Sequence, residues 1–158
     1  MKNKQLLIDI LKYIDLNLYS KISINDLSQN FYFNKDYIMR IFKKKFGITI
    51  IDYINKKRIF NSLNALKDNN KLILSISIEY GFISQEYYCE IFKKIIGVSP
   101  NIYRKFIYNL QSISYDDIAK IRKNLTDLNK ELKIIENYKY SKSIEFVKKL
   151  SLNYHHYN

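Results

Sequence analysis

The sequence has few of the residues that build disulfide frameworks, phosphate loops and metal centres. Among its 158 residues there are one cysteine, one proline, three glycines and two histidines. The single Cys89 excludes an internal disulfide and is typical of a reducing compartment. Three scattered glycines leave no glycine-rich phosphate loop. Nucleotide-dependent chemistry and a disulfide-stapled fold are therefore not expected.

The remaining candidates for catalysis and metal binding are equally sparse. Cys89 has no histidine near it in the sequence, and we interpret it as an ordinary thiol. His155 and His156 are adjacent, whereas two imidazoles on one helix face need a spacing of four. The sequence predicts no cofactor, no metal and no enzymatic activity.

Long apolar runs are also missing. No segment reaches the roughly 18 apolar residues of a membrane helix, and Asp9 interrupts the apolar run that could imitate a signal peptide. We expect a cytoplasmic protein without a membrane segment.

What the sequence does have is positive charge, with a net value of +12. Residues 1–106 contain eighteen basic and nine acidic side chains, and residues 107–158 contain nine and six. A charge of this size indicates a polyanionic partner. The length allows one domain with an appendage, and it is too short for a sensor domain besides.

An internal repeat organises the first two thirds of the chain. The stretch 37–49, YIMRIFKKKFGIT, recurs as 87–99, YYCEIFKKIIGVS, and residues 24–33 match residues 73–82. Apolar residues at spacings of three and four predict a helix in each copy, and Gly47 and Gly97 end the two helices. A short helix that leads into each long one gives two helix-turn-helix units.

Capping residues mark where the predicted helices begin. Ser23 with Asp26 and Thr49 with Asp52 have the spacing of a capping box, and Ser99-Pro100 begins a short helix through residue 103. Asn34 and Ser84 cap the second helix of each unit. A first amphipathic helix is expected over 4–18, and a turn over 68–71.

A long helix over 50–66 is predicted to join the two units and to set their spacing. Its inward residues are expected to be Ile51, Ile54, Phe60, Leu63 and Leu66, with Lys56, Lys57 and Arg58 on other faces.

Residues 5–106 resemble the AraC/XylS-type bacterial transcription regulators. The resemblance rests on Gly81-Phe82, Phe92-Lys-Lys, Gly97-Val-Ser-Pro100 and Tyr103-Arg104, with Tyr53 and Arg58 at the family's positions in the connecting helix. The chain departs from the pattern at Ser28 and Ser77, where alanine is usual, at Asn34, where serine is usual, and at Glu90, where a basic residue is common. The resemblance implies an all-α fold with two helix-turn-helix units in residues 1–107 and a C-terminal helical extension, residues 108–158.

This resemblance and the helix chemistry together predict a sequence-specific regulator that binds double-stranded DNA. The recognition helices, about 34–45 and 84–95, are expected to enter successive major grooves, which lie about 34 Å apart. Base-reading candidates lie on their exposed faces: Lys35, Asp36, Met39, Arg40, Gln85, Glu86, Cys89 and Glu90. Phosphate-binding candidates are Asn34, Lys43, Lys44, Lys45, Ser84, Lys93 and Lys94.

Several of these candidates have a second interpretation. Arg40 suits guanine O6 and N7, but it could also be a solvated surface residue. Glu86 could accept from a cytosine amine, or it could only complement the positive end of its helix. A lysine run is often only a solvated face.

The extension carries a second apolar pattern. Six residues alternate at spacings of three and four: Ile118, Ile121, Leu125, Leu128, Leu132 and Ile135. The pattern predicts either a coiled-coil homodimer through residues 115–137 or an amphipathic helix folded back on the domain. Residues 142–150 are expected to add a short helix containing Ile144, Val147 and Leu150.

Two other functions fit parts of the sequence. An interaction protein would keep the fold and use its C-terminal helix to titrate or bridge another regulator or RNA polymerase. A non-specific nucleoid or RNA-binding protein would account for the charge but not for two distinct recognition faces.

Overall fold

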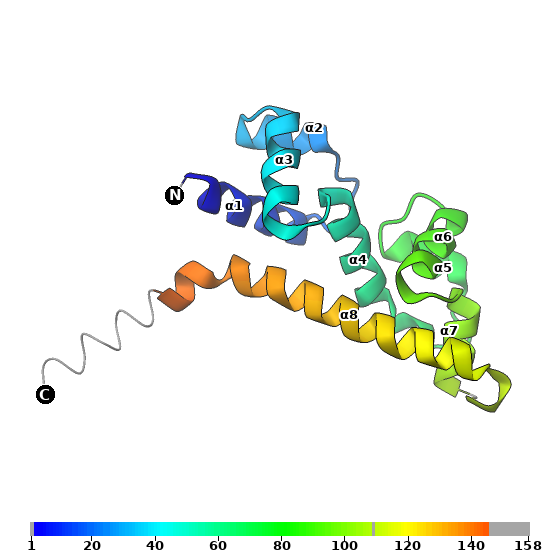
Figure 1. Ribbon diagram of the computed structural model, residues 1–158. Helices are drawn as coiled ribbons and strands as arrows, with labels where there is room; N and C mark the ends of the chain where they lie inside the picture. The colour runs from blue at the N-terminus through cyan, green and yellow to red at the C-terminus, as the bar shows by residue number, and fades with distance from the viewer. Residues whose placement is uncertain (1, 109, 146–158) are drawn as a thin grey trace, which may run out of the picture.

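The structure is a computed structural model that describes residues 2–108 and 110–145. Within these residues the fold contains helices and no strand, which confirms the predicted all-α class. Figure 1 shows the helices gathered in two groups, with α4 between them and α8 running beneath both. The helices are α1 (Lys2–Leu16), α2 (Ile24–Phe31), α3 (Lys35–Phe46), α4 (Ile50–Ser62), η1 (Ala65–Lys67), α5 (Ile73–Glu79), α6 (Gln85–Ile96), α7 (Pro100–Tyr108), η2 (Leu110–Ser112) and α8 (Tyr115–Lys139).

The two predicted helix-turn-helix units are α2 with α3 and α5 with α6. Ser23 and Thr49 both form the predicted capping boxes with an aspartate three residues on. Gly47 and Gly97 end α3 and α6 in the left-handed conformation, with φ of 76° and 92°. Asn34 and Ser84 cap the starts of α3 and α6, as predicted, so local sequence signals account for both ends of each recognition helix. The helix predicted to stop at residue 103 instead continues to Tyr108.

The connecting helix is shorter than predicted, because α4 ends at Ser62 and not at residue 66. The Ser62 hydroxyl is hydrogen-bonded to the Ile59 carbonyl oxygen, 2.8 Å away, and to the Tyr88 hydroxyl, 3.0 Å away. The next backbone N–H, that of Leu63, donates to a carbonyl three residues back, so the chain tightens into the 3-10 helix η1.

The predicted inward face of α4 is also partly wrong. Ile51 and Phe60 are 42% and 37% exposed, whereas Arg58, expected on an outer face, is buried at 8%. The Arg58 guanidinium is buried because it has partners: Nε donates to the Leu18 carbonyl at 2.7 Å, and Nη2 donates to the Ser20 carbonyl at 2.8 Å. Arg58 therefore fastens the loop between α1 and α2 to α4.

The apolar seam of α8 lies inside the fold. Ile121, Leu128, Leu132 and Ile135 are at most 8% exposed, and α8 packs on α1, α4 and α6. The sequence allowed either a coiled-coil homodimer or a helix folded back on the domain, and in the structure α8 is folded back on its own domain. A homodimer through residues 115–137 would have to use the opposite, largely polar face of α8.

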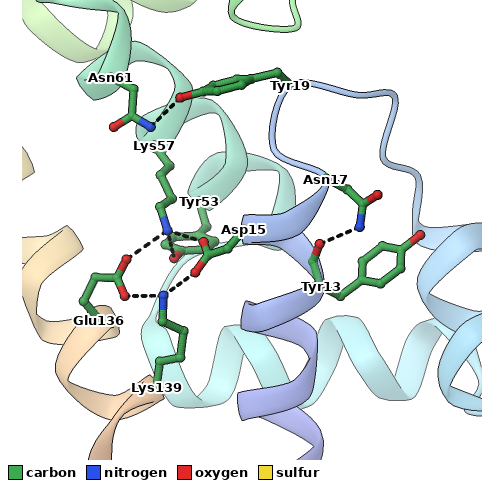
Figure 2. A network of polar contacts seen from close by, with 9 residues as sticks. All are labelled: Tyr13, Asp15, Asn17, Tyr19, Tyr53, Lys57, Asn61, Glu136 and Lys139. Atoms are coloured by element: carbon green, nitrogen blue, oxygen red, sulfur yellow. Dashed lines mark hydrogen bonds and ion pairs between the residues drawn. The ribbon is translucent and has the colours of Figure 1, made fainter.

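Charged side chains hold α8 against α1 and α4 (Figure 2). Asp15 of α1 pairs with both Lys57 of α4 and Lys139 of α8, and Lys57 also donates to Glu136 at 2.9 Å. Partial burial favours the neutral form of Glu136, but hydrogen bonds from Lys139 and Lys57 outweigh it and lower the pKa of its carboxyl. The network therefore joins three helices through ionised groups.

In residues 2–108 and 110–145, no helix combines the length and the apolar character that a membrane crossing requires. Residues 141–145 are helical, as predicted for the start of 142–150. Val147, Leu150, His155 and His156 lie outside the described residues.

Candidate nucleic-acid interface

The exposed face of α3 carries all four base-reading candidates of the first unit. The Asn34 side-chain oxygen accepts from the Asp36 backbone N–H at 2.8 Å, so Asn34 is the N-cap. Lys35, Asp36, Met39 and Arg40 follow it in the first two turns, and each is exposed. The sequence-predicted group therefore lies together near the N-terminus of one helix, where base contacts are usual in a helix-turn-helix protein.

Arg40 has few interactions with the rest of the protein. Its guanidinium carbon lies 5.6 Å from the centre of the Tyr37 ring, and within the described residues it has no carboxylate partner. The described residues also show no hydrogen bond from the guanidinium, so its N–H donors are available to an external acceptor.

The start of α4 borders the same face, which the sequence did not reveal. An apolar hollow of about 380 Å³ lies between Met39, Arg40 and Lys43 of α3 and Thr49 and Ile51 of α4. The exposure of Ile51, unexpected for a core residue, is explained by this position at the rim of the hollow.

The candidate phosphate ligands fall into two sets. Lys43, Lys44 and Lys93 are exposed. Lys45 and Lys94 are exposed too, but the Lys45 ammonium lies 4.6 Å from the centre of the Tyr138 ring, and Lys94 lines a groove between α4, α6 and α8. Lys45 and Lys94 thus face α8, and the first set is better placed beside the recognition faces.

The start of α6 is capped by Ser84 and carries the acidic side chain of Glu86. The Ser84 hydroxyl accepts from the Tyr87 backbone N–H at 3.1 Å. Hydrogen bonds from its own backbone N–H and from Ser84 lower the pKa of the Glu86 carboxyl. Glu86 is thus an ionised group at the helix start, which favours the interpretation that it complements the helix end.

Two other candidates on α6 are half-buried. Gln85 and Cys89 are only partly accessible, while Glu90 is exposed. Burial, with a smaller contribution from the Glu86 charge, raises the pKa of the Cys89 thiol, so the thiol is protonated and is not an activated nucleophile. Tyr87 accepts a hydrogen bond at 3.0 Å from Asn55 of α4, and it belongs to the joint between the units.

Two arginines, Arg58 and Arg104, have a structural role that the sequence did not predict. Arg58 fastens the α1–α2 loop, and in the second unit Arg104 donates from Nε to the Leu66 carbonyl at 3.3 Å and from Nη2 to the Lys71 carbonyl at 2.7 Å. The available signal was the spacing of four among Ile54, Arg58 and Ser62, which places the arginine on the buried face of α4.

The described residues contain no group of three or more histidine, cysteine or acidic side chains that could hold a metal ion. The candidate functional surface of the described part consists of the faces of α3 and α6, fifty residues apart in sequence. Its arrangement defines a protein with two helix-turn-helix units in tandem.

Comparisons with known proteins agree with this class. A family model described as a helix-turn-helix domain matches residues 27–105. The HTH-type transcriptional activator AarP of Providencia stuartii is 31% identical over 110 residues, which cover 70% of this chain and 78% of AarP. The chain belongs to the AraC/XylS family of bacterial transcription regulators.

Solved structures share the fold. The C-terminal domain of the response regulator yesN from Fusobacterium nucleatum is 27% identical, with a TM-score of 0.55 over 66% of this chain and 99% of that one. The DNA-binding domain of AdpA, solved in complex with a target DNA, has a TM-score of 0.58 at 18% identity, over 67% of this chain and 97% of that one.

Proposed function

We propose that this protein regulates transcription by binding a specific double-stranded DNA site, with α3 and α6 in successive major grooves. The observation that carries the proposal is the pair of capped, exposed recognition helices that the fold holds on one domain. A helix fits the major groove, and its exposed side chains can reach base edges there.

Base recognition is assigned to the exposed helix faces. On α3 the proposed base-reading residues are Lys35, Asp36, Met39 and Arg40, and on α6 they are Gln85, Glu86, Cys89 and Glu90. Arg40 is the principal one, because its open guanidinium can bond guanine O6 and N7 together. The half-burial of Gln85 and Cys89 leaves them less surface for such contacts.

Phosphate contacts are assigned to the basic helix ends and the caps. The residues are Asn34, Lys43, Lys44, Lys45, Ser84, Lys93 and Lys94. Of these, Lys43, Lys44 and Lys93 have the strongest support, since Lys45 and Lys94 face α8. Backbone N–H groups at the starts of helices add to phosphate binding.

The alternative of a titrating interaction protein is less favoured, because the seam it would use is buried against α1, α4 and α6. The division between residues 1–107 and 108–158, contact with RNA polymerase and a homodimer through 115–137 stay predictions.

A mobility-shift series with genomic fragments and competitor DNA tests the proposal. We expect a subset of fragments to bind in the presence of competitor, with affinity that falls steeply with salt. If six to ten phosphates are neutralised, affinity should fall about 10³–10⁵-fold between 50 and 200 mM salt. Equal binding to every fragment would instead indicate a non-specific protein, and a flat salt dependence would exclude DNA as the partner.

A further inference from the structure

Helix α8 touches the C-terminal end of both recognition helices. At α6, the Asn124 side-chain amide donates to the Ile96 carbonyl oxygen at 2.9 Å, which satisfies one of the last carbonyls of the helix. At α3, the Tyr138 ring meets the Phe46 ring edge to face, with centroids 5.3 Å apart. One continuous helix therefore contacts both units of the repeat.

The two contacts have a fixed separation. Asn124 and Tyr138 are fourteen residues apart, which is about 21 Å along a helix axis and close to four full turns. Both side chains thus point to nearly the same side of α8. Because a helix has a constant rise, the distance between these two anchor points cannot change unless α8 bends or detaches.

The internal repeat supplies a control for the contact at α6. A Cβ added at Gly97 would lie 2.7 Å from the Asn124 amide nitrogen and 3.3 Å from the Lys120 Cβ. A Cβ added at the equivalent Gly47 would meet nothing within 4 Å. The same capping glycine is therefore covered by α8 in one unit and open in the other.

Charged groups also hold the C-terminal half of α8 against the domain. Asp15, Lys57 and Lys139 join α8 to α1 and α4, and Lys56 of α4 pairs with Glu131 of α8. Helix α4 is itself tied to α6 by the hydrogen bond from Asn55 to Tyr87. Helices α4, α6 and α8 therefore contact one another pairwise, an arrangement that resists rotation better than one connecting helix does.

We propose that α8 is a strut that fixes the spacing and angle of the two recognition helices, and so decides which spacing of DNA subsites the protein accepts. Asn124 and Tyr138 are its positioning residues. The inference rests on the proposed function, and it adds a determinant of specificity that lies beyond residue 105, where the match to the family model ends. A helix that served only to complete the core would stabilise the fold without affecting the choice of spacing.

The test uses the full chain and a set of target fragments in which one subsite is moved by one or two base pairs in either direction. A shift of one base pair turns a subsite by about 34–36° around the duplex. The variant that releases both anchors is Asn124→Ala with Tyr138→Ala. The matched control is Asn129→Ala with Tyr115→Ala, which removes the same residue types from exposed positions of α8.

We expect the wild type and the control to lose about tenfold or more in affinity when the spacing departs from the best one, since rigidly linked modules lose avidity when they cannot engage together. In the release variant the loss should fall below about threefold, while affinity for a single subsite stays within about twofold. A release variant that keeps the wild-type spacing profile would overturn the proposal.

A second pair of variants decides the matter if the release variant does not fold or if hydrogen exchange shows that α8 stays docked. Gly97→Ala and Gly47→Ala both place a methyl group on a left-handed residue, but only the first crowds the Asn124 amide and the Lys120 Cβ of α8. A flattened spacing profile is expected for Gly97→Ala alone, and identical profiles for the two variants would contradict the role of α8. Failure of the wild type to prefer any fragment would refute the proposed function instead.

Discussion

The recognition faces of α3 and α6 differ in charge, and this difference gives a prediction about DNA binding. Arg40 and Glu90 occupy equivalent positions on α3 and α6, fifty residues apart, and both are exposed. We expect Arg40→Ala to weaken binding to the target strongly, and Glu90→Gln to leave it unchanged or to strengthen it. The first unit would then dominate affinity, and the second would adjust it.

The magnitudes follow from the surroundings of each side chain. Within the described residues, the Arg40 guanidinium makes no hydrogen bond or ion pair and lies over the Tyr37 ring, so its removal should change the free energy of unfolding by less than about 0.5 kcal/mol. The loss then appears in binding, where a bidentate contact with guanine contributes about 1–3 kcal/mol, or about 5–150-fold. Loss of the Glu90 charge removes a repulsion of about 0.6 kcal/mol for a phosphate about 7 Å away in water.

The assay is a pair of titrations for each variant, one with target DNA and one with a scrambled fragment, at a single salt concentration. Arg40→Ala should reduce the difference in affinity between the two fragments, while Glu90→Gln should strengthen binding mainly to the scrambled one. If Glu90→Gln loses target affinity as severely as Arg40→Ala while scrambled binding is unchanged, Glu90 reads a base directly and the unequal division is wrong.

Four further substitutions test the stability of the fold. Arg58→Lys should lower the free energy of unfolding by about 1.5–3 kcal/mol in denaturant titrations, because one ammonium cannot reach both carbonyls. Arg104→Lys should lower the free energy of unfolding less than Arg58→Lys does, because the Arg104 site is more open. Equal losses for the two variants would argue that burial does not determine the size of the effect. Leu128→Asp should destabilise the monomer by at least about 3 kcal/mol; if it only dissociates a dimer in sedimentation, the intramolecular seam is wrong. The contribution of the Glu136 carboxylate to the free energy of unfolding should be complete above its ordinary pKa of 4.5 and should be lost as the pH falls through its lower folded-state pKa. In acid, the denaturant midpoint of unfolding should therefore fall less for Glu136→Gln than for the wild type.

Local sequence was enough to predict the two helix-turn-helix units. The apolar spacing, the caps at Ser23 and Thr49 and the stops at Gly47 and Gly97 act over a few residues, and each occurs where expected. For the same reason the exposed face of α3 could be predicted, because helical periodicity fixes which side chains share a face.

The sequence alone could not decide where α8 packs. Its seam has the same apolar periodicity whether the buried partner is a second subunit or the helix's own domain, since burial of apolar surface has no directional preference. Only the tertiary structure places Ile121 and Leu128 inside the fold and Asn124 on the end of α6.

The burial of Arg58 and the orientation of Lys45 could not be predicted from the sequence either. A cation normally stays in water, and Arg58 is buried only because folding brings the carbonyls of Leu18 and Ser20, about forty residues away in sequence, within hydrogen-bonding distance. Lys45 is exposed, but its ammonium lies over the ring of Tyr138, far along the chain, and is thereby directed toward α8. The sequence by itself determined the helices and their caps, whereas contacts between distant residues determined which charged side chains remain available for a partner.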